Sequence, residues 1–458
     1  MQPVVIIGGG ISGLSTAYYL ARHGVPARLI ERRERLGGVI ETERVQGCVL
    51  EAGPDSFIAQ KPWALELIRE LGLGGDVIGS NDHLRVTYVL KHGRLVPLPD
   101  GLMLMIPTRI VPMAATSLLG WRTKIRMGLE WFRKPDSLHA DQSVAKFVAD
   151  HYGQEAVDYL AEPLLAGVYG GDPNKLSVTS VLPRFVELES KYGSLTKGVL
   201  HERRKAARQS KGMPLFQTLK GGLGQLVDAL TAQTRPAPEV LRGEAQAVER
   251  NGTGYRIRLN DEWTEAGHVV LACQAYQAGA LIGSLDPAFA ALLDAVPYSS
   301  SITISLGYER PSFKHPLNGF GFLIPKRERK LLVACTWVGT KFSYRVAPDR
   351  AVLRCFVGGE DESVLGLTDE ELASGVRAEL RAIMGVTETP VFTHIARWPR
   401  SMAQYTVGHA ARLREIEARL KALPGLHVAG NAYTGIGIPD CVRMGKAAAG
   451  AIAAASAR

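Results

Sequence analysis

Three glycines near the N-terminus, Gly8, Gly10 and Gly13, have the spacing of a phosphate-binding turn. Gly8 permits a tight turn, Gly10 lets the backbone approach a pyrophosphate, and Gly13 allows the following helix to pack closely. Glu31 comes 18 residues after Gly13, where its carboxylate can accept a hydrogen bond from an adenosine ribose hydroxyl. This pattern predicts a dinucleotide site with the pyrophosphate at a helix N-terminus.

The elements expected around these residues form a βαβ unit. Residues 4–7 are a β-branched run, apolar residues recur at helical spacing over 11–22, and 27–31 has the pattern of a second strand. Strand, turn and helix therefore follow in the order that the glycine fingerprint requires, because the turn must join a strand to a helix N-terminus. The N-terminal region is predicted to be α/β.

A second glycine pair, Gly37 and Gly38, follows soon after Glu31 and allows another loop to close over the pyrophosphate. This addition is typical of flavin-binding proteins. The chain has one full dinucleotide fingerprint, and its five cysteines include no CxxC pair, so a second nicotinamide site and a disulfide reductase are disfavoured. We expect electrons to pass from the flavin to a small acceptor such as oxygen.

The other end of the chain is predicted to complete the same domain. Residues 426–431 have the pattern of a strand and turn, and the glycine-rich segment 435–439 leads into a helix in which Pro439 suits the first turn. This helix N-terminus would stabilise an anionic reduced flavin by roughly 0.3–1 kcal/mol; a glycine-capped core helix is the alternative. The middle of the chain is then inserted between two halves of a cofactor domain.

The middle of the chain, inserted between these two halves, is predicted to form two further structural parts. Strand patterns occur at 255–259, 268–272, 301–308, 321–324, 331–336 and 352–357 and predict a second, sheet-containing domain. Residues 102–134 mix Met and Trp with Arg and Lys, which indicates either a helical insertion packed into the core, the interpretation we favour, or a basic amphipathic surface. The basic run 201–211 is expected to be a solvated face without chemistry.

Composition excludes several classes. A chain of 458 residues that is 46% hydrophobic and 22% charged is neither disordered nor collagen-like, and its length favours two or three domains. The net charge of +9 favours an anionic partner such as an acidic metabolite, a lipid surface or nucleic acid. We expect no signal peptide, no membrane-spanning helix, no metal site and a cytoplasmic location.

Longer phrases resemble a known family. The chain is similar to the protoporphyrinogen/coproporphyrinogen oxidase family of the flavin amine-oxidase superfamily in EAGPDSF (51–57), EPLLAGVYGGDPNKLS (162–177), FQTLKGGLGQLVDAL (216–230), GFGFLIP (319–325) and GNAYTGIGIPDC (430–441). The resemblance runs nearly end to end. It implies non-covalent FAD and the oxygen-dependent oxidation of a porphyrinogen to a porphyrin with release of hydrogen peroxide.

The resemblance also implies an α/β fold: a Rossmann-like FAD-binding domain, an inserted sheet-containing substrate domain and a helical insertion called the membrane-binding domain in relatives. The implied ranges are 1–75, 213–283 and 424–458 for the FAD-binding domain, 76–97, 185–212 and 284–423 for the substrate-binding domain, and 98–184 for the helical insertion. A porphyrinogen and oxygen are then the partners, rather than nucleic acid. Peripheral membrane contact and product handover to a ferrochelatase are further expectations.

The implied site residues fall into two groups. Those expected to hold FAD are Gly8, Gly9, Gly10, Ile11, Ser12, Gly13, Glu31, Arg32, Gly37, Gly38, Gly53, Pro54, Asp55, Ser56, Val248, Trp398, Gly430, Ile436, Gly437 and Ile438. For the substrate, Gly167 is expected near the pyrrole nitrogens and Phe320 and Leu323 against the ring faces, with Phe356 as a further candidate. No side chain is assigned as an acid or base, because the flavin carries the chemistry.

One departure from the family concerns the substrate. Many protoporphyrinogen-specific relatives have an arginine where this chain has Thr87. With Lys61 after the GPDSF motif, this resembles the bacterial branch that oxidises coproporphyrinogen, a tetracarboxylate for which Lys61 is a candidate cation; an exposed helix-start lysine is the alternative. A flavin amine oxidase or polyene desaturase-like enzyme is the alternative function, and a flavin-bearing membrane- or partner-binding protein is the non-enzymatic one.

Overall fold

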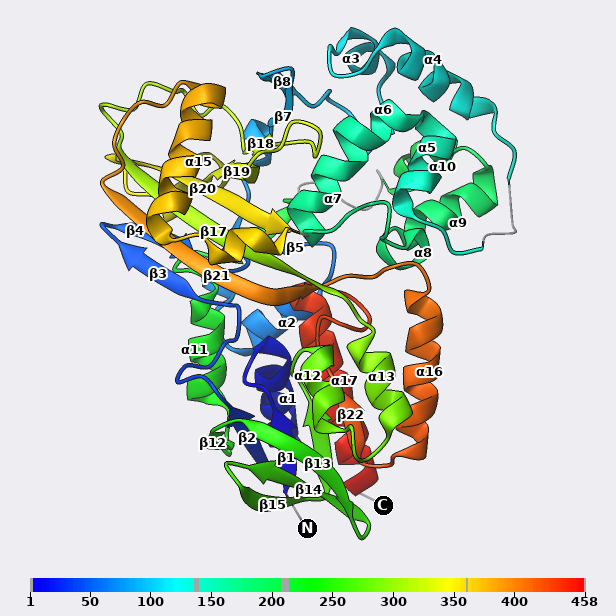
Figure 1. Ribbon diagram of the computed structural model, residues 1–458, viewed down its shortest axis with the longest axis vertical. Coiled ribbons are helices and arrows are strands. Elements are labelled where there is room, and N and C mark those ends of the chain that lie inside the picture. Colours follow the sequence, from blue (N-terminus) through cyan, green and yellow to red (C-terminus); the bar gives the residue numbers. More distant parts are fainter. Residues whose placement is uncertain (1–2, 136–139, 207–213, 360, 457–458) are drawn as a thin grey trace.

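The computed structural model describes residues 3–135, 140–206, 214–359 and 361–456, and Figure 1 shows their arrangement. The predicted βαβ unit is present as β1 (Val4–Ile7), α1 (Ile11–Arg22) and β2 (Ala27–Glu31). Strand β1 is buried along its whole length because it lies in the middle of a five-stranded parallel sheet. The prediction of an α/β N-terminal region is confirmed.

Distant segments of the chain meet in this sheet. The order is β12-β2-β1-β16-β22, in which β12 is Glu239–Arg242, β16 is His268–Leu271 and β22 is Leu426–Val428. All four neighbouring pairs are parallel. Three strands of the second half of the chain therefore extend the sheet that the N-terminus begins.

Helix α17 (Ile438–Ser456) packs along α1 in the same layer. A small residue permits this contact, because a Cβ added at Gly445 would lie only 2.7 Å from the Ser12 carbonyl oxygen. The first turn of α17 is thereby fixed beside the glycine-rich turn that follows β1. Both ends of the chain converge at one place.

A seven-stranded sheet forms the second layered part, in the order β21-β17-β20-β19-β18-β7-β8. Its strands are β7 (Thr87–Lys91), β8 (Arg94–Pro97), β17 (Tyr298–Glu309), β18 (Gly321–Leu323), β19 (Leu332–Trp337), β20 (Arg350–Gly359) and β21 (Phe392–Ala403). Four of them, β17 to β20, correspond to the strands predicted at 301–308, 321–324, 331–336 and 352–357. The prediction is wrong for 255–259 and 268–272, because these residues form a strand of a separate three-stranded sheet and β16 of the parallel sheet. Helix α15 (Asp369–Met384) buries Leu372, Val376 and Leu380 against a second hydrophobic core.

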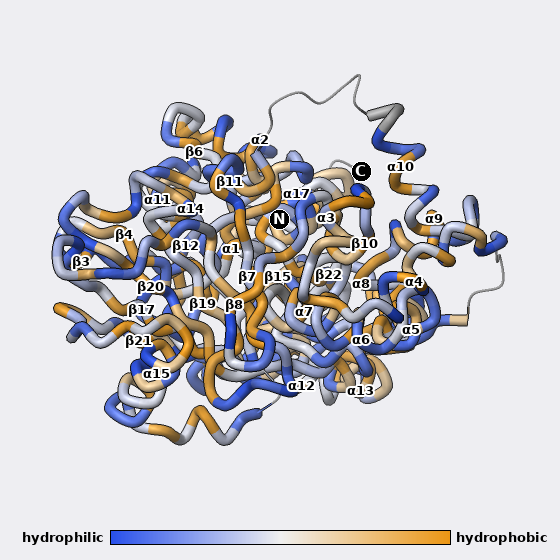
Figure 2. The backbone as a smooth tube through the Cα atoms, turned by 90° about the horizontal axis from the view of Figure 1, so that it is seen from above, coloured by the Kyte–Doolittle hydropathy of each residue, from blue (hydrophilic) through white to orange (hydrophobic). Residues whose placement is uncertain are grey.

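The helical part lies on the opposite side of the molecule from this sheet (Figure 2). It comprises α3 (Ile110–Ala115), α4 (Trp121–Leu129), η3 (Glu130–Phe132), α5 (Val144–Tyr152), α6 (Gln154–Ala156), η4 (Val157–Ala161), α7 (Glu162–Tyr169), α8 (Val178–Val181), α9 (Pro183–Tyr192) and α10 (Leu195–Ala206). The boundary expected after residue 184 falls inside α9. Because α9 packs on α8 and α10 packs on η3, the helical part continues to residue 206.

The prediction that 102–134 is helical from its start is wrong for the first residues. Strands β9 (Leu102–Met103) and β10 (Ile106–Pro107) form a short hairpin there. Its turn places Leu104 at a φ of 56°, and Pro107 has no N–H to donate, so a helix cannot run through this segment. Part of the basic run, 207–211, lies outside the described residues.

The remaining elements connect these parts. They are β3 (Thr42–Val45), β4 (Cys48–Glu51), β5 (Phe57–Ile58), α2 (Trp63–Glu70), η1 (Gly74–Asp76), β6 (Val77–Gly79), η2 (Asp82–Leu84), β11 (Phe216–Leu219), α11 (Gly224–Gln233), β13 (Ala245–Asn251), β14 (Gly254–Leu259), β15 (Glu262–Ala266), α12 (Ala275–Leu281), α13 (Pro287–Asp294), α14 (Val338–Lys341), η5 (Ser343–Arg345), η6 (Glu362–Gly366) and α16 (His409–Ala422). Within the described ranges, no helix combines the length and the apolar character needed to cross a bilayer.

Candidate active site

One large cavity, of about 1460 Å³, lies where the parallel sheet, the seven-stranded sheet and the helical part meet. Its wall includes the turn after β1, the first turn of α17, strand β18 and helix α7. Single small-molecule sites typically occupy about 300–1,000 Å³. The cavity therefore has room for a cofactor and a second molecule beside it.

The glycine-rich turn has the geometry of a dinucleotide cradle. Gly8 adopts a φ of 112°, and a Cβ at Gly13 would lie 1.9 Å from the Gly8 carbonyl oxygen. A Cβ at Gly10 would meet nothing closer than Gly38 Cα at 4.0 Å, which leaves open space over the turn. The turn thus requires glycine for its own shape and presents bare backbone to the cavity at the N-terminus of α1.

The second glycine loop closes on the first. Gly37 N–H donates to the Gly9 carbonyl at 2.8 Å, and Gly10 and Gly37 form an isolated parallel bridge. A further glycine, Gly53, is required because its Cβ would lie 1.8 Å from the Val39 carbonyl oxygen. The second loop therefore packs backbone to backbone on the turn, and the Gly53 segment packs in the same way on the second loop.

Glu31 lies at the end of β2 and lines the cavity. Its Oε2 accepts the N–H of Gly9 and its Oε1 accepts the N–H of Arg33, each at 2.8 Å. The two backbone donors fix the orientation of the carboxylate, and each oxygen keeps a lone pair for a further donor. The arrangement fits the adenosine ribose that the sequence pattern predicts, and FAD fits the cradle as a whole.

Most residues predicted to hold the cofactor do line the cavity. Those that line it are Gly8, Gly10, Ile11, Ser12, Glu31, Arg32, Gly37, Gly38, Gly53, Pro54, Asp55, Ser56, Trp398, Gly430, Ile436, Gly437 and Ile438. Gly9 and Gly13 lie beneath the turn and shape it. Val248 does not line the cavity, because its fully buried side chain belongs to β13 opposite Ile257; the segment contributes Gly243–Gln246 instead.

Two cations that sequence reasoning missed hold Asp55. Lys341 Nζ lies 2.8 Å and Arg354 Nη1 3.6 Å from Asp55 Oδ2. Burial alone would raise the pKa of Asp55, but the two cations hold it well below its usual range. Arg354 also donates to the Gly53 carbonyl. Lys341 and Arg354 come from the seven-stranded part, so only the fold brings them to the GPDS segment.

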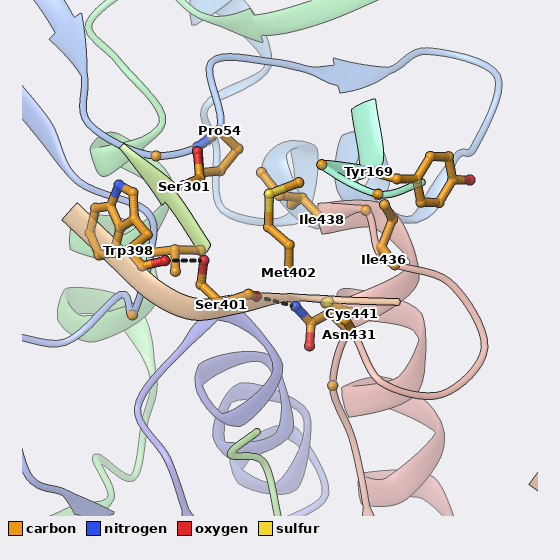
Figure 3. A pocket seen from close by; sticks show the side chains of 18 of the residues that line it. Pro54, Tyr169, Ser301, Trp398, Ser401, Met402, Asn431, Ile436, Ile438 and Cys441 are labelled. Atoms are coloured by element: carbon orange, nitrogen blue, oxygen red, sulfur yellow. Dashed lines mark hydrogen bonds between the residues drawn. The ribbon is translucent and has the colours of Figure 1, made fainter. Parts of the chain in front are cut away.

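The N-terminus of α17 faces the cavity, as expected. Figure 3 shows Ile436 and Ile438 on the same hollow as Tyr169 and Met402. The first turn also carries Asp440, whose buried Oδ2 lies 2.6 Å from Lys61 Nζ. The predicted cation Lys61 therefore lines the cavity but already has an anionic partner.

Strand β21 supplies Ser401 and Met402 to the cavity. Both lie in the phrase RWPRSMAQYTVGH (397–409), which also resembles the family, but neither was assigned to the site from the sequence. Asn431 Nδ2 donates to the Ser401 carbonyl at 2.9 Å, and Ser401 Oγ donates to the Trp398 carbonyl at 3.0 Å (Figure 3). The indole N–H of Trp398 donates to the Ala52 carbonyl at 2.8 Å. These bonds fix the strand against the segment that follows β22.

The predicted substrate residues form one wall. Gly167 of α7 faces Leu323 of β18, and a Cβ at Gly167 would lie 3.2 Å from Leu323 Cδ2. Phe320 and Phe356 line the same cavity, and Thr87 pairs with Gly321 on the adjacent strand. The structure thus brings all the predicted substrate residues to the cavity as a mainly apolar slot suited to a flat ring.

Comparisons with known proteins agree with this site. Residues 11–453 match the family described as flavin containing amine oxidoreductase. The coproporphyrinogen III oxidase of Bacillus subtilis (strain 168) is 34% identical, with 97% of this chain and 96% of that protein covered. The enzyme of the same name from Staphylococcus aureus is 32% identical over 98% of both chains. The mitochondrial protoporphyrinogen oxidase of Nicotiana tabacum is 26% identical, with 96% and 93% covered.

Solved structures share the architecture. A crystal structure from Exiguobacterium sp. 255-15, provisionally assigned as a protoporphyrinogen oxidase, superposes with a TM-score of 0.88 at 31% identity over 99% of both chains. A putrescine oxidase variant has a TM-score of 0.73 at 18% identity over 99% of both chains, which is a likeness of fold. The expected fold is confirmed, and FAD is the cofactor that the cradle and the family indicate. The chain belongs to the flavin containing amine oxidoreductase family.

Proposed function

We propose that this oxidoreductase converts coproporphyrinogen III to coproporphyrin III, with protoporphyrinogen IX as a second substrate. The observation that carries the proposal is the mainly apolar slot lined by Gly167, Phe320, Leu323 and Phe356, which belongs to the same cavity as the dinucleotide cradle. The names of the relatives in Bacillus subtilis and Staphylococcus aureus support it. An amine oxidase or polyene desaturase-like activity is not favoured by these relatives.

The residues of the slot contribute to the reaction by holding the substrate in place. Bound FAD would supply a two-electron acceptor. Because a porphyrinogen loses six electrons and six protons in becoming a porphyrin, three such steps would be needed, with three molecules of oxygen reduced to three of hydrogen peroxide. Phe320 and Leu323 offer apolar surface on which a flat macrocycle can lie. Gly167 lets the backbone of α7 pack closely on Leu323 beside them, since a Cβ there would lie 3.2 Å from Leu323 Cδ2. Water is displaced from these apolar walls, and the substrate is held in a fixed orientation toward the cofactor cradle.

Replacement of the slot aromatic tests the assignment. We expect Phe320→Ala to lower kcat/KM for coproporphyrinogen III about tenfold or more, because a buried ring that supports the macrocycle is lost. Flavin content, read from the absorbance of the purified protein, should not change. Trp263→Ala is the matched control, since Trp263 lies on β15 outside the cavity lining. Unchanged turnover of Phe320→Ala would remove the slot as the substrate site.

Peripheral contact with the cytoplasmic face of a membrane is part of the proposal. The supporting feature is an exposed apolar patch on α3, α4 and η3, in which Ile110, Val111, Trp121 and Phe132 are 67–87% exposed. Arg122 stacks on Trp121 within this patch and adds positive charge. Such a surface buries its apolar side chains in a headgroup layer while its cation remains among anionic lipids.

Product release at such a surface suits an apolar product. Coproporphyrin is flat and poorly hydrated over its ring faces, so direct transfer to a ferrochelatase would limit its exposure to water. We include this handover in the proposal. To test it, the rate of coproporphyrin transfer to a ferrochelatase is measured with and without an excess of a porphyrin-binding protein that captures free coproporphyrin.

A further inference from the structure

The loop between β18 and β19 places an unusual concentration of charge at the cavity. Residues 326–330 read Lys-Arg-Glu-Arg-Lys, four cations and one acid within five positions. Lys326, Arg329 and Lys330 line the cavity. The loop directly continues β18, whose Leu323 packs on Gly167 in the wall of the slot.

Ion pairs and hydrogen bonds hold this loop in place. Arg329 Nη2 lies 2.7 Å from Glu162 Oε1, and Glu162 Oε2 accepts the Lys326 N–H at 2.8 Å. Glu162 is buried at the start of α7. Arg329 therefore has a structural partner on the opposite wall, and its charge is already compensated.

The acid of the loop anchors its other side. The two carboxylate oxygens of Glu328 accept the N–H groups of His92 and Gly93 at 2.8 and 3.1 Å. This is the turn between β7 and β8, and β7 begins at Thr87. The basic loop is thus attached to the turn that follows the strand beginning at Thr87.

The remaining cations differ in how they are paired. Lys326 Nζ lies 2.8 Å from Asp172 Oδ2 while 61% of its side chain stays exposed. Lys330 is exposed and makes no ion pair within the part of the chain that the structure describes. Glu379 is an acid that interacts electrostatically with Lys330, but its carboxylate already accepts the N–H groups of Leu331 and Leu332. Lys330 is accordingly the loop cation best able to take an added anion.

We propose that Lys330, assisted by Lys326, binds carboxylates of the macrocyclic substrate at the rim of the slot and favours the tetracarboxylate over the dicarboxylate. This inference rests on the proposed function. The loop continues the apolar wall and its backbone is anchored on both sides. Lys330, which has no ion pair among the described residues, and the exposed, paired Lys326 both line the cavity, where carboxylate substituents of the ring can reach them. Lys61 and Lys341 are less suited, because each has a carboxylate partner, at 2.6 and 2.8 Å, and their side chains are only 45% and 13% exposed. Lys326 is also paired, but 61% of its side chain is exposed.

The test compares Lys330→Gln, Lys330→Arg and Lys326→Gln/Lys330→Gln with the FAD-loaded wild type. KM and kcat are measured for coproporphyrinogen III and for protoporphyrinogen IX at low and high salt. We expect Lys330→Gln to raise KM for coproporphyrinogen about fivefold at low salt, with kcat within about twofold. The double variant should show a larger effect, protoporphyrinogen a smaller one, and Lys330→Arg should restore KM.

Controls separate this inference from the proposed function. Lys314→Gln removes an exposed lysine of the same sheet region that does not line the cavity, and its KM values should equal those of the wild type. Flavin content shows that each variant is folded. If the wild type oxidises both porphyrinogens and Lys330→Gln leaves the ratio of their KM values unchanged, the inference is wrong. If the wild type oxidises neither, the proposed function itself fails.

Discussion

At the scale of single residues, the cradle requires glycine, because a Cβ atom at Gly13 would clash with the backbone of the turn. We expect Gly13→Ala to abolish most FAD binding, because the new methyl group would lie 1.9 Å from the Gly8 carbonyl oxygen and would displace the turn. The clash should also lower the free energy of unfolding by roughly 1–3 kcal/mol. The ratio of flavin to protein absorbance after purification measures the first effect, and thermal unfolding measures the second.

A second glycine substitution provides the control. Gly450 lies in α17, and a Cβ there would meet no atom within 4 Å. Gly450→Ala should retain FAD and raise the free energy of unfolding by about 0.5–1 kcal/mol, since alanine is the better helix former. Equal flavin content in the Gly13 and Gly450 variants would contradict the assignment of the cradle.

At the scale of elements, a buried ionic cluster joins helices of the helical part. His151 of α5 lies 3.1 Å from both Glu130 Oε1 of η3 and Glu189 Oε1 of α9. Glu130 also accepts the Ser194 hydroxyl at 2.8 Å, beside the start of α10. The cluster therefore links segments separated by up to 66 positions.

This cluster predicts a pH dependence of stability. Burial alone would lower the pKa of His151, but the hydrogen bonds to Glu130 and Glu189 raise it above 6.5. Because the pKa of His151 is higher in the folded than in the unfolded protein, protonated His151 stabilises the fold. This contribution to the free energy of unfolding is fully present below pH 6.5 and is lost as the pH rises through the pKa of the folded state.

His151→Gln should remove this alkaline decline. Loss of one partner of a buried pair should also lower the free energy of unfolding by roughly 3–5 kcal/mol at pH 6. Thermal unfolding of both proteins from pH 6 to 9 tests both effects. An equally steep alkaline decline in the variant would show that His151 does not cause it.

The patch on α3, α4 and η3 gives another prediction at this scale. We expect Trp121→Glu/Phe132→Glu to weaken sedimentation with anionic phospholipid vesicles at least tenfold, because each lost apolar side chain contributes about 1.5–3 kcal/mol when buried. Trp263→Glu serves as the control, since Trp263 is exposed elsewhere, on β15. Vesicle binding that is equal in all three proteins would exclude the patch as the contact surface.

The same segment shows what periodicity alone can predict. Met105, Met113 and Met127 are buried, as core packing of 102–134 requires, whereas Trp121 and Phe132 are mostly exposed. Both interpretations of the sequence therefore describe part of the segment. Helical spacing identifies an apolar face, but the partner that covers the face is set by tertiary structure.

At the scale of the whole molecule, local motifs located the cradle and long-range contacts completed it. The turn around Gly10 and the acid Glu31 could be predicted because both depend on residues close in sequence. Lys341 and Arg354 could not, since about 290–300 positions separate them from Asp55 and Gly53 and only the seven-stranded sheet brings them there. The basic loop 326–330 had no motif, and its position beside the slot follows from the register of β18 with β7.

The most direct test of the central claim uses purified, FAD-loaded protein in air. Coproporphyrinogen III and protoporphyrinogen IX are supplied in parallel, and porphyrin fluorescence is followed against an enzyme-free control for spontaneous oxidation. We predict faster formation of coproporphyrin, with hydrogen peroxide released in step. No fluorescence above the spontaneous rate with either substrate would contradict the proposed function.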